Sequence, residues 1–314
     1  MLQRNELKWI LLWFGAIIAV SFSAVFGKIF IDKMPVYTFL AIWNLFLMLI
    51  IMSFYWLKNI VREMKNHSKT ELSILIIVWL FLWIIVPLLY YTWLEKTFAI
   101  NTILISRIEP IFAWIIGILR IWERFSWGKL FSMLIMFLGV SIVVTEWFSG
   151  KLSINYYDIL IVLAALFWAI ATNAIKKHLQ KTEVEVTTFI ISSMGAFFFI
   201  VLYPIITNTQ HEVWKFLDMN TIVLLFLYSF VVLFLWNTLW VKALKKVQVN
   251  KLSLISLTYP IFGVLLSYMI LWEKIASYHV YWLIIIILWL LLGFLHRKKF
   301  NLFHPSEKFH HVKL

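Results

Sequence analysis

The 314-residue sequence contains no cysteine, and only 14% of its residues are charged. Without cysteine the chain can form neither a disulfide nor a thiolate metal site, and it has no cysteine nucleophile. Soluble domains carry about 25% charged residues. The shortage of charge, together with 63% hydrophobic residues and a mean hydropathy of +0.91, therefore excludes a soluble globular protein.

Histidine and aspartate are missing from the interior of the apolar runs. All eight histidines lie in predicted loops, at the ends of runs or in the C-terminal tail. Clusters of ionisable residues inside the membrane would be needed for transition-metal transport, for a membrane metalloprotease or for a histidine proton relay. The sequence also has no nucleotide-binding loop and no Ser/His arrangement typical of hydrolysis. We therefore expect no enzyme activity, no cofactor and no metal.

Ten apolar runs are long enough to cross a membrane as helices. Alternating strand periodicity is absent, and helices satisfy their own backbone polar groups within lipid. The sequence therefore predicts an all-α integral membrane protein with ten transmembrane helices. The runs cover roughly residues 7–30, 36–57, 71–97, 100–120, 127–146, 157–177, 186–207, 219–241, 251–271 and 277–296.

Lysine and arginine are distributed unequally between the two sides of the membrane. If the helices alternate in direction, 21 of the 28 basic residues lie on the side of the N-terminus, six lie on the other side, and Arg107 lies inside a run. The positive-inside rule then predicts a multi-pass protein of the plasma (inner) membrane with both termini cytoplasmic. The net charge of +13 is explained by these loops, so we expect membrane lipid and no nucleic acid as a partner.

The sequence repeats itself at an offset of 150 residues. Ser106, Pro110 and Phe112 return in the same register as Ser256, Pro260 and Phe262, and a Trp-Glu pair at 122–123 returns at 272–273. The repeat contains five spans, an odd number, so the second copy would enter the membrane inverted. Inverted repeats are common among secondary transporters, whose substrate site lies near the midplane between the halves. The predicted domains are residues 1–150, residues 151–296 and a cytoplasmic basic tail, 297–314.

Arg107 and Glu109 are the charged residues that lie clearly within the apolar runs. A charge at the bilayer centre costs about 2.5–3.5 kcal/mol on insertion scales. The two residues are two positions apart, which on a helix places them about 200° apart around the axis. The two side chains therefore cannot both point into one cavity. Either they are neutralised by neighbouring helices, or Arg107 binds a carboxylate or phosphate of the substrate and Glu109 orients it or couples a proton. Their counterparts, Leu257 and Tyr259, are uncharged.

Other polar and aromatic residues within the runs are candidates for the wall of a central cavity. For Trp168 the alternative is packing against the core or lipid. These candidates are Ser21, Tyr90, Tyr91, Trp168, Thr172, Asn173, Asn237, Trp240 and Tyr259.

Prolines and glutamates in the repeats are candidates for structural or gating roles. Pro87, Pro110 and Pro260 each remove a backbone donor and can permit bending during gating. Glu123 and Glu273 follow the ends of runs, where a negative charge meets the negative end of the helix dipole. Each glutamate should therefore find a partner, and the free N–H groups at the start of the next run, near Ser126 and Ser277, are the expected partners.

These segments together resemble the drug/metabolite transporter superfamily, and within it the EamA-type ten-helix transporters. The resemblance covers almost the whole chain and rests on residues 104–113, 122–126, 257–263 and 272–275, and on Ala165–Ala169 with Lys176 in the sixth run. Departures are Val20 in place of the usual tryptophan, and Trp122 and Trp272 where the family usually has glycine before glutamate.

The resemblance implies a secondary transporter, an exporter or exchanger, that moves small metabolites through a central cavity by alternating access. With Arg107 in that cavity, the substrate is expected to be anionic or zwitterionic, and proton coupling stays open. The alternative from another class is a non-transporting, lipid-handling or structural membrane protein.

Overall fold

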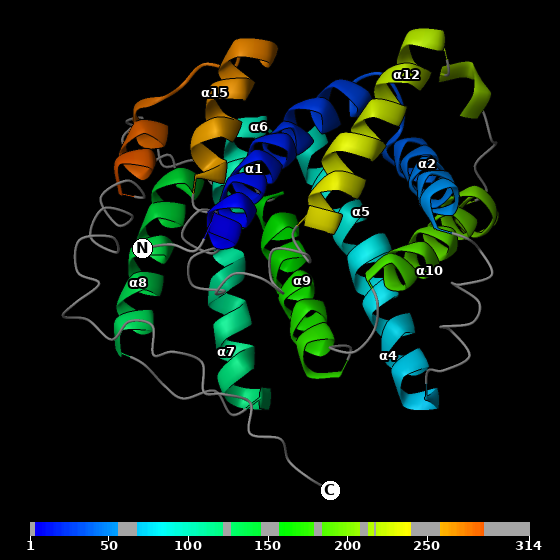
Figure 1. Cartoon of the computed structure of the whole chain (residues 1–314). Helices are drawn as coiled ribbons and strands as arrows, with labels where there is room; N and C mark the ends of the chain where they lie inside the picture. The colour runs from blue at the N-terminus through cyan, green and yellow to red at the C-terminus, as the bar shows by residue number, and fades with distance from the viewer. Residues whose placement is uncertain are drawn as a thin grey trace, which may run out of the picture.

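The structure is a computed structural model that describes residues 4–55, 68–121, 127–145, 157–178, 184–207, 213–216, 218–239 and 258–285. In these ranges every regular element is a helix and no strand occurs (Figure 1). The prediction of an all-helical protein is therefore confirmed for the described part of the chain.

The helices of the first half agree closely with the predicted runs, and several runs are made of more than one helical element. The α-helices are α1 (Arg4–Ile31), α2 (Val36–Phe54), α4 (Lys69–Trp79), α5 (Val86–Glu95), α6 (Ala99–Ile105), α7 (Glu109–Ile121) and α8 (Trp127–Val144). The π-helical element η1 (Leu80–Ile85) joins α4 to α5, and the 3₁₀ element η2 (Ser106–Ile108) joins α6 to α7.

The second half has a similar succession of elements. Its α-helices are α9 (Asp158–His178), α10 (Val184–Phe197), α11 (Tyr203–Thr207), α12 (Met219–Leu227) and α15 (Tyr259–Leu271), and the π-helical elements are η3 (Phe198–Leu202) and η5 (Tyr228–Leu235). A 3₁₀ turn, η4 (Val213–Phe216), precedes α12. The elements η1 and η5 lie at matching positions of the two repeats, so the third and eighth runs share a π-helical distortion.

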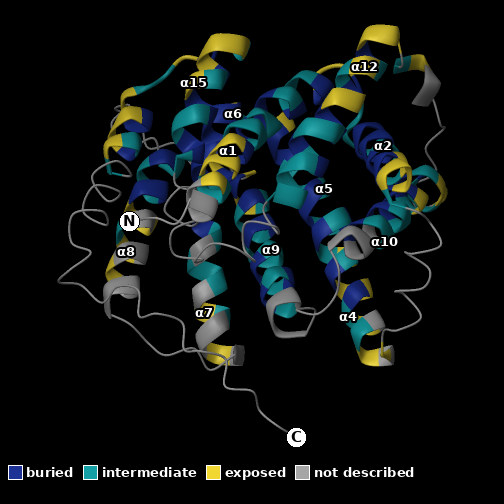
Figure 2. Cartoon of the chain, in the orientation of Figure 1, coloured by how far each residue is buried: buried dark blue, intermediate teal, exposed yellow. Residues whose placement is uncertain are grey.

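Five helical segments are long and apolar enough to cross a membrane: Lys8–Ile31, Val36–Phe54, Ser73–Glu95, Thr188–Ile205 and Met219–Leu239. Two shorter apolar helices are Asp158–Ala174 and Tyr259–Leu271. Large apolar side chains such as those of Leu119 and Ile205 are mostly exposed. Figure 2 shows exposed segments on many of the helices. Apolar exposure on this scale fits a lipid environment, and the chain is a multi-pass membrane protein.

Proline explains the break between α6 and α7. Pro110 has no N–H to donate to the carbonyl of Ser106 four residues earlier. The N–H of Glu109 donates to that carbonyl instead, which closes a 3₁₀ turn over residues 106–108. Arg107 therefore lies in the short, tight turn between two α-helices.

The helices α6 and α15 approach each other closely where Gly263 meets Ile103. A Cβ atom on Gly263 would lie 2.8 Å from Ile103 Cδ1, so a larger residue would force a shift. Small residues at helix contacts of membrane proteins permit this proximity. At one end of the bundle, called the upper end from its place in Figure 1, α1 and α15 end while α2, α6 and α12 begin.

Candidate functional site

The guanidinium group of Arg107 lies over the ring of Tyr259, at the start of α15, with Cζ 4.4 Å from the ring centroid. This is a cation–π contact between the two sequence repeats, worth about 2 kcal/mol or more when desolvated. Arg107 Nε is buried and has no hydrogen-bond partner within the described residues, and Nη2 is 3.5 Å from Ser106 Oγ, which is the limit of a hydrogen bond. Arg107 therefore has unused donor capacity.

Glu109 turns to a different neighbour. Its carboxylate accepts a hydrogen bond from the indole N–H of Trp168 on α9. In the part of the chain that the structure describes, no ion pair joins Glu109 to Arg107. The two charged side chains diverge towards α9 and α15, as their helical spacing predicts. Both residues are half-buried, so part of each side chain stays accessible from outside the protein.

Four tyrosines connect the Arg107 site to the second repeat. The Tyr90 hydroxyl donates to Tyr259, and the Tyr90 and Tyr91 rings have centroids 5.0 Å apart in an edge-to-face arrangement. The hydroxyls of Tyr91 and Tyr228 lie 2.8 Å apart, and both rings are buried. Tyr228 was not predicted as a site residue, because its counterpart in the first repeat, Val78, gives no polar signal at that position.

The remaining polar candidates on the helices are engaged in contacts between or within helices. Asn173 donates to the backbone oxygens of Ala113 and Ala169, at 3.1 Å and 2.8 Å, and so ties α9 to α7. Thr172 donates to the carbonyl of Trp168, one turn earlier on α9.

Two further candidates join helices by hydrogen bonds. Ser21 donates to its own helix at Ile17 and lies 3.4 Å from the carbonyl oxygen of Tyr259. The Asn237 amide donates to Thr188 Oγ1 at 2.7 Å. Both contacts position helices, and they leave the group around Arg107 as the strongest candidate for binding a solute.

The structure describes only some of the remaining candidates, which are Trp240 and the predicted proline and glutamate positions. Trp240 and Glu123 lie outside the described residues. Pro87 and Pro260 are buried near the starts of α5 and α15, where a missing N–H is tolerated. For Pro110 the structure describes the backbone, which starts α7 just after the 3₁₀ turn.

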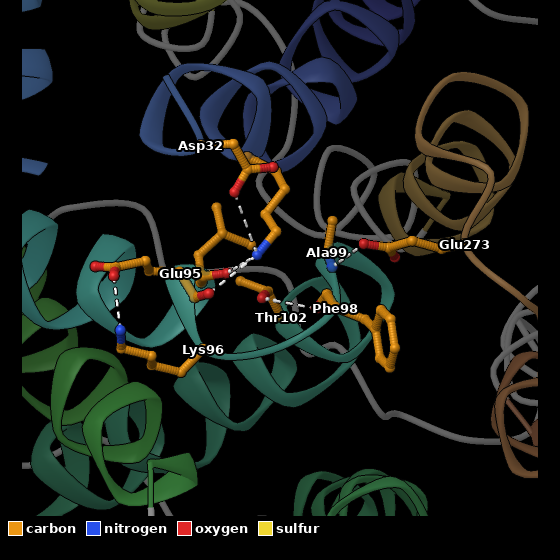
Figure 3. A network of polar contacts seen from close by, with 9 residues as sticks. Asp32, Glu95, Lys96, Phe98, Ala99, Thr102 and Glu273 are labelled. Atoms are coloured by element: carbon orange, nitrogen blue, oxygen red, sulfur yellow. Dashed lines mark hydrogen bonds and ion pairs between the residues drawn. The ribbon is translucent and has the colours of Figure 1, made fainter. Parts of the chain in front are cut away.

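Glu273 has the partner that its position demands, but the expected location of that partner was wrong. Its carboxylate accepts the N–H groups of Ala99 and Ile100, at 2.6 Å and 2.9 Å, at the start of α6 rather than near Ser277 (Figure 3). In the connector beyond α15, burial raises the pKa of this carboxyl, and the two backbone donors oppose that rise. The contact joins residues that are 174 positions apart.

His279 is a second anchor that sequence reasoning missed. It is buried, and its Nε2 lies 2.8 Å from Asn101 Oδ1 on α6. The N–H of Ala276 donates to Nδ1, so the neutral ring carries its proton on Nε2 and donates to Asn101. An isolated histidine at the start of an apolar run gives no sequence signal for such a contact.

Residues 7–145 and 155–295 each match the EamA-like transporter family. The chain belongs to this family. The two matches cover the two repeats, so the EamA-like unit occurs twice along the chain, and the family is one of membrane transporters.

Two relatives of this EamA-like protein are described as uncharacterized transporters. The one from Synechocystis sp. is 30% identical over 198 residues, which is 60% of this chain and 56% of that protein. The one from Methanothermobacter thermautotrophicus is 26% identical over 147 residues, or 46% of this chain and 43% of that protein. The chain thus spans about half the length of these curated relatives.

A solved crystal structure supports the fold of this EamA-like protein. It superposes with a TM-score of 0.63 over 94% of this chain and 98% of that chain, at 13% identity. A likeness at this identity concerns the fold alone.

Proposed function

We propose that this EamA-like protein is a secondary transporter, an exporter or exchanger, of small metabolites that carry a carboxylate or phosphate group. It works by alternating access in the plasma membrane, with the substrate bound between the two repeats. Arg107 is the residue that binds the acidic group, and the rings of Tyr259 and Tyr90 lie beside its guanidinium.

The observation that carries this proposal is the incomplete pairing of Arg107. No carboxylate of the described residues lies within ion-pair distance of its guanidinium, and its buried Nε has no acceptor. An arginine in lipid without an acidic partner is costly, and the face of Tyr259 compensates for only part of that cost. A planar, bidentate acceptor such as a carboxylate or phosphate would satisfy the free donors.

The relation between α6 and α15 supports an inverted arrangement of the two five-helix repeats. At the offset of 150 residues, α15 corresponds to α7, and α6 and α7 are consecutive parts of the fourth predicted run. At the upper end α6 begins while α15 ends, since Glu273 beyond α15 contacts Ala99 (Figure 3). The fourth and ninth runs are equivalent, and their opposite directions are what an inverted repeat of an odd number of spans requires. Ten spans with cytoplasmic termini complete this topology.

Glu109 is a second charged residue near the site, and its side chain points away from that of Arg107. Its contact with Trp168 places it towards α9, whereas Arg107 points towards α15. The carboxylate suits either the ammonium group of a zwitterionic substrate or a transported proton. A variant Glu109→Gln distinguishes these roles: loss of the response to a proton gradient with retained exchange indicates coupling, and loss of exchange indicates substrate binding.

The direct test is solute counterflow in proteoliposomes with a panel of carboxylates, phosphates and amines. We expect acidic solutes to exchange, and Arg107→Ala to reduce their exchange by about 30-fold or more, because removing one partner of a buried charge pair costs at least about 2 kcal/mol. Lys33→Ala, at an exposed lysine of the upper end, is the matched control and should keep full activity.

The proposal fails if Arg107→Ala exchanges acidic solutes as fast as the unmodified protein. A thermal-shift screen separates it from a lipid-handling or structural protein: stabilisation by soluble acids supports transport, and a response to lipids alone supports the alternative.

A further inference from the structure

The helices α6 and α15 each connect the candidate site to the upper end of the bundle. Ala99 is the first residue of α6, and Arg107 lies in η2, directly after α6. The distance from Ala99 to Arg107 along the helix axis is roughly 12 Å. Tyr259 begins α15, and Glu273 follows its end. One end of this helix pair therefore carries the Arg107–Tyr259 contact, and the other carries the contact of Glu273 with Ala99 and Ile100.

Between these two contacts the helices pack tightly against each other. A side chain on Gly263 would meet Ile103 Cδ1 at 2.8 Å and Ile103 Cγ2 at 3.1 Å. Gly263 and Ile103 lie between the site and the upper end on their respective helices. A change of crossing angle about this point would move both ends of the pair at once.

The hydrogen bonds of Glu273 to Ala99 and Ile100 are charge-assisted, but water can replace them when the two segments separate. The carboxylate follows the C-terminal end of α15, where its charge opposes the helix dipole, and the N–H groups of α6 compensate. Glu273 is buried, while Phe98 and Trp272 beside the two partners are largely exposed. On separation, water at this end can therefore solvate both the carboxylate and the N–H groups.

A bend is already present at the other end of α6. The 3₁₀ turn of residues 106–108 holds Arg107, and Pro110 keeps α7 from continuing the hydrogen-bond ladder of α6. Short 3₁₀ segments inside a longer helix are frequent at hinges. Arg107 thus occupies the position at which α6 can change direction relative to α7.

We propose that α6 and α15 act as a crossed pair in which Glu273 latches the upper end closed against Ala99 and Ile100, and that this latch opens once in each transport cycle as the Arg107–Tyr259 end rearranges around substrate. This inference rests on the proposed function. The hydrogen bond between His279 and Asn101 belongs to the same closed end, because it joins the segment after Glu273 to α6.

The absence of cysteine makes the latch testable by thiol labelling. Thr102, on α6 one turn below Phe98, is fully buried. In Thr102→Cys protein reconstituted in nanodiscs, a water-soluble maleimide should react slowly. Adding Glu273→Gln should raise the labelling rate by about tenfold, because loss of one charge-assisted hydrogen bond shifts the open fraction by roughly that factor.

Two further variants keep the test decisive. Glu273→Asp retains the charge on a shorter side chain, should give an intermediate rate, and replaces Glu273→Gln if that variant does not fold. Glu123→Gln changes the corresponding glutamate of the first repeat and should leave the labelling of position 102 unchanged.

An unchanged rate in the folded Glu273 variants would overturn the latch, and so would equal increases with Glu273→Gln and Glu123→Gln. Because labelling needs neither a substrate nor a gradient, this result is independent of whether acidic solutes are exchanged in the counterflow assay.

Discussion

Arg107 and Tyr259 form a cation–π contact across the two sequence repeats, with the guanidinium carbon 4.4 Å from the ring centroid. Tyr259 occupies the position of Glu109 in the second repeat, since the two are 150 residues apart. The second copy therefore has a neutral aromatic ring where the first copy has a carboxylate. This asymmetry leaves the arginine held in place without neutralising its charge.

The first prediction separates the ring of Tyr259 from its hydroxyl. Tyr259→Phe keeps the aromatic face and loses the bond from Tyr90, which should lower the free energy of unfolding by about 1 kcal/mol. Tyr259→Leu also removes the cation–π contact and should cost about 2 kcal/mol more. The free energies are measured by denaturant unfolding in detergent, with the same substitutions in an Arg107→Gln background as the control. If the Leu and Phe variants differ as much in that background, the contact does not stabilise the protein.

Sequence alone predicted the helical membrane fold because its signals are local. Long apolar runs, the scarcity of charge and the repeated segments can all be recognised without knowing which helices touch. The 200° separation of Arg107 and Glu109 also follows from helix geometry, and the structure places them against different helices. The resemblance at residues 104–113 and 257–263 identified the family, which the match over both repeats confirms.

The partners of these residues depend on contacts between distant segments, and local patterns do not encode them. Glu273 was expected to bond the start of the next run, but the start of α6 satisfies it. The partners of His279 and Tyr228 likewise come from another helix, 178 and 137 residues away. Such partners follow only from the way in which the two repeats pack together.

A second prediction concerns the hydroxyl pair of Tyr91 and Tyr228. Their oxygens are 2.8 Å apart in a buried cluster of rings that includes Phe39 and Trp43. Either Tyr→Phe substitution leaves one hydroxyl buried without this partner, which should cost about 1–3 kcal/mol. The double variant removes both hydroxyls and should cost less than the sum of the single variants. Additive losses in the free energy of unfolding would show that the pair is not coupled.

A third prediction tests the crossing of α6 and α15. Gly263→Ala places a methyl group against Ile103 and should destabilise the protein by about 1–3 kcal/mol, as overpacking does. Ile103→Val removes the Cδ1 atom that would clash at 2.8 Å. The double variant should therefore recover much of the lost thermal stability.

The control for this crossing is Gly15→Ala. A Cβ at Gly15 would meet nothing within 4 Å, and alanine is the better helix former by about 1 kcal/mol. Gly15→Ala should thus leave the melting temperature unchanged or raise it. A destabilising Gly263→Ala that Ile103→Val does not relieve would contradict the proposed close contact.

The last prediction concerns Trp272, which ends α15 with a φ of 57°. This left-handed conformation favours glycine and tolerates asparagine, whereas other L-residues lose roughly 1–2 kcal/mol in it. The family usually has glycine here, and the tryptophan side chain is 80% exposed, so little packing is lost on its removal. Trp272→Asn should therefore raise the melting temperature and keep the turn that brings Glu273 to α6. Tyr268→Asn, at a half-exposed position within α15, is the matched control and should lower the melting temperature, because asparagine is a poor helix former. If both variants lose stability equally, the conformation of Trp272 carries no strain.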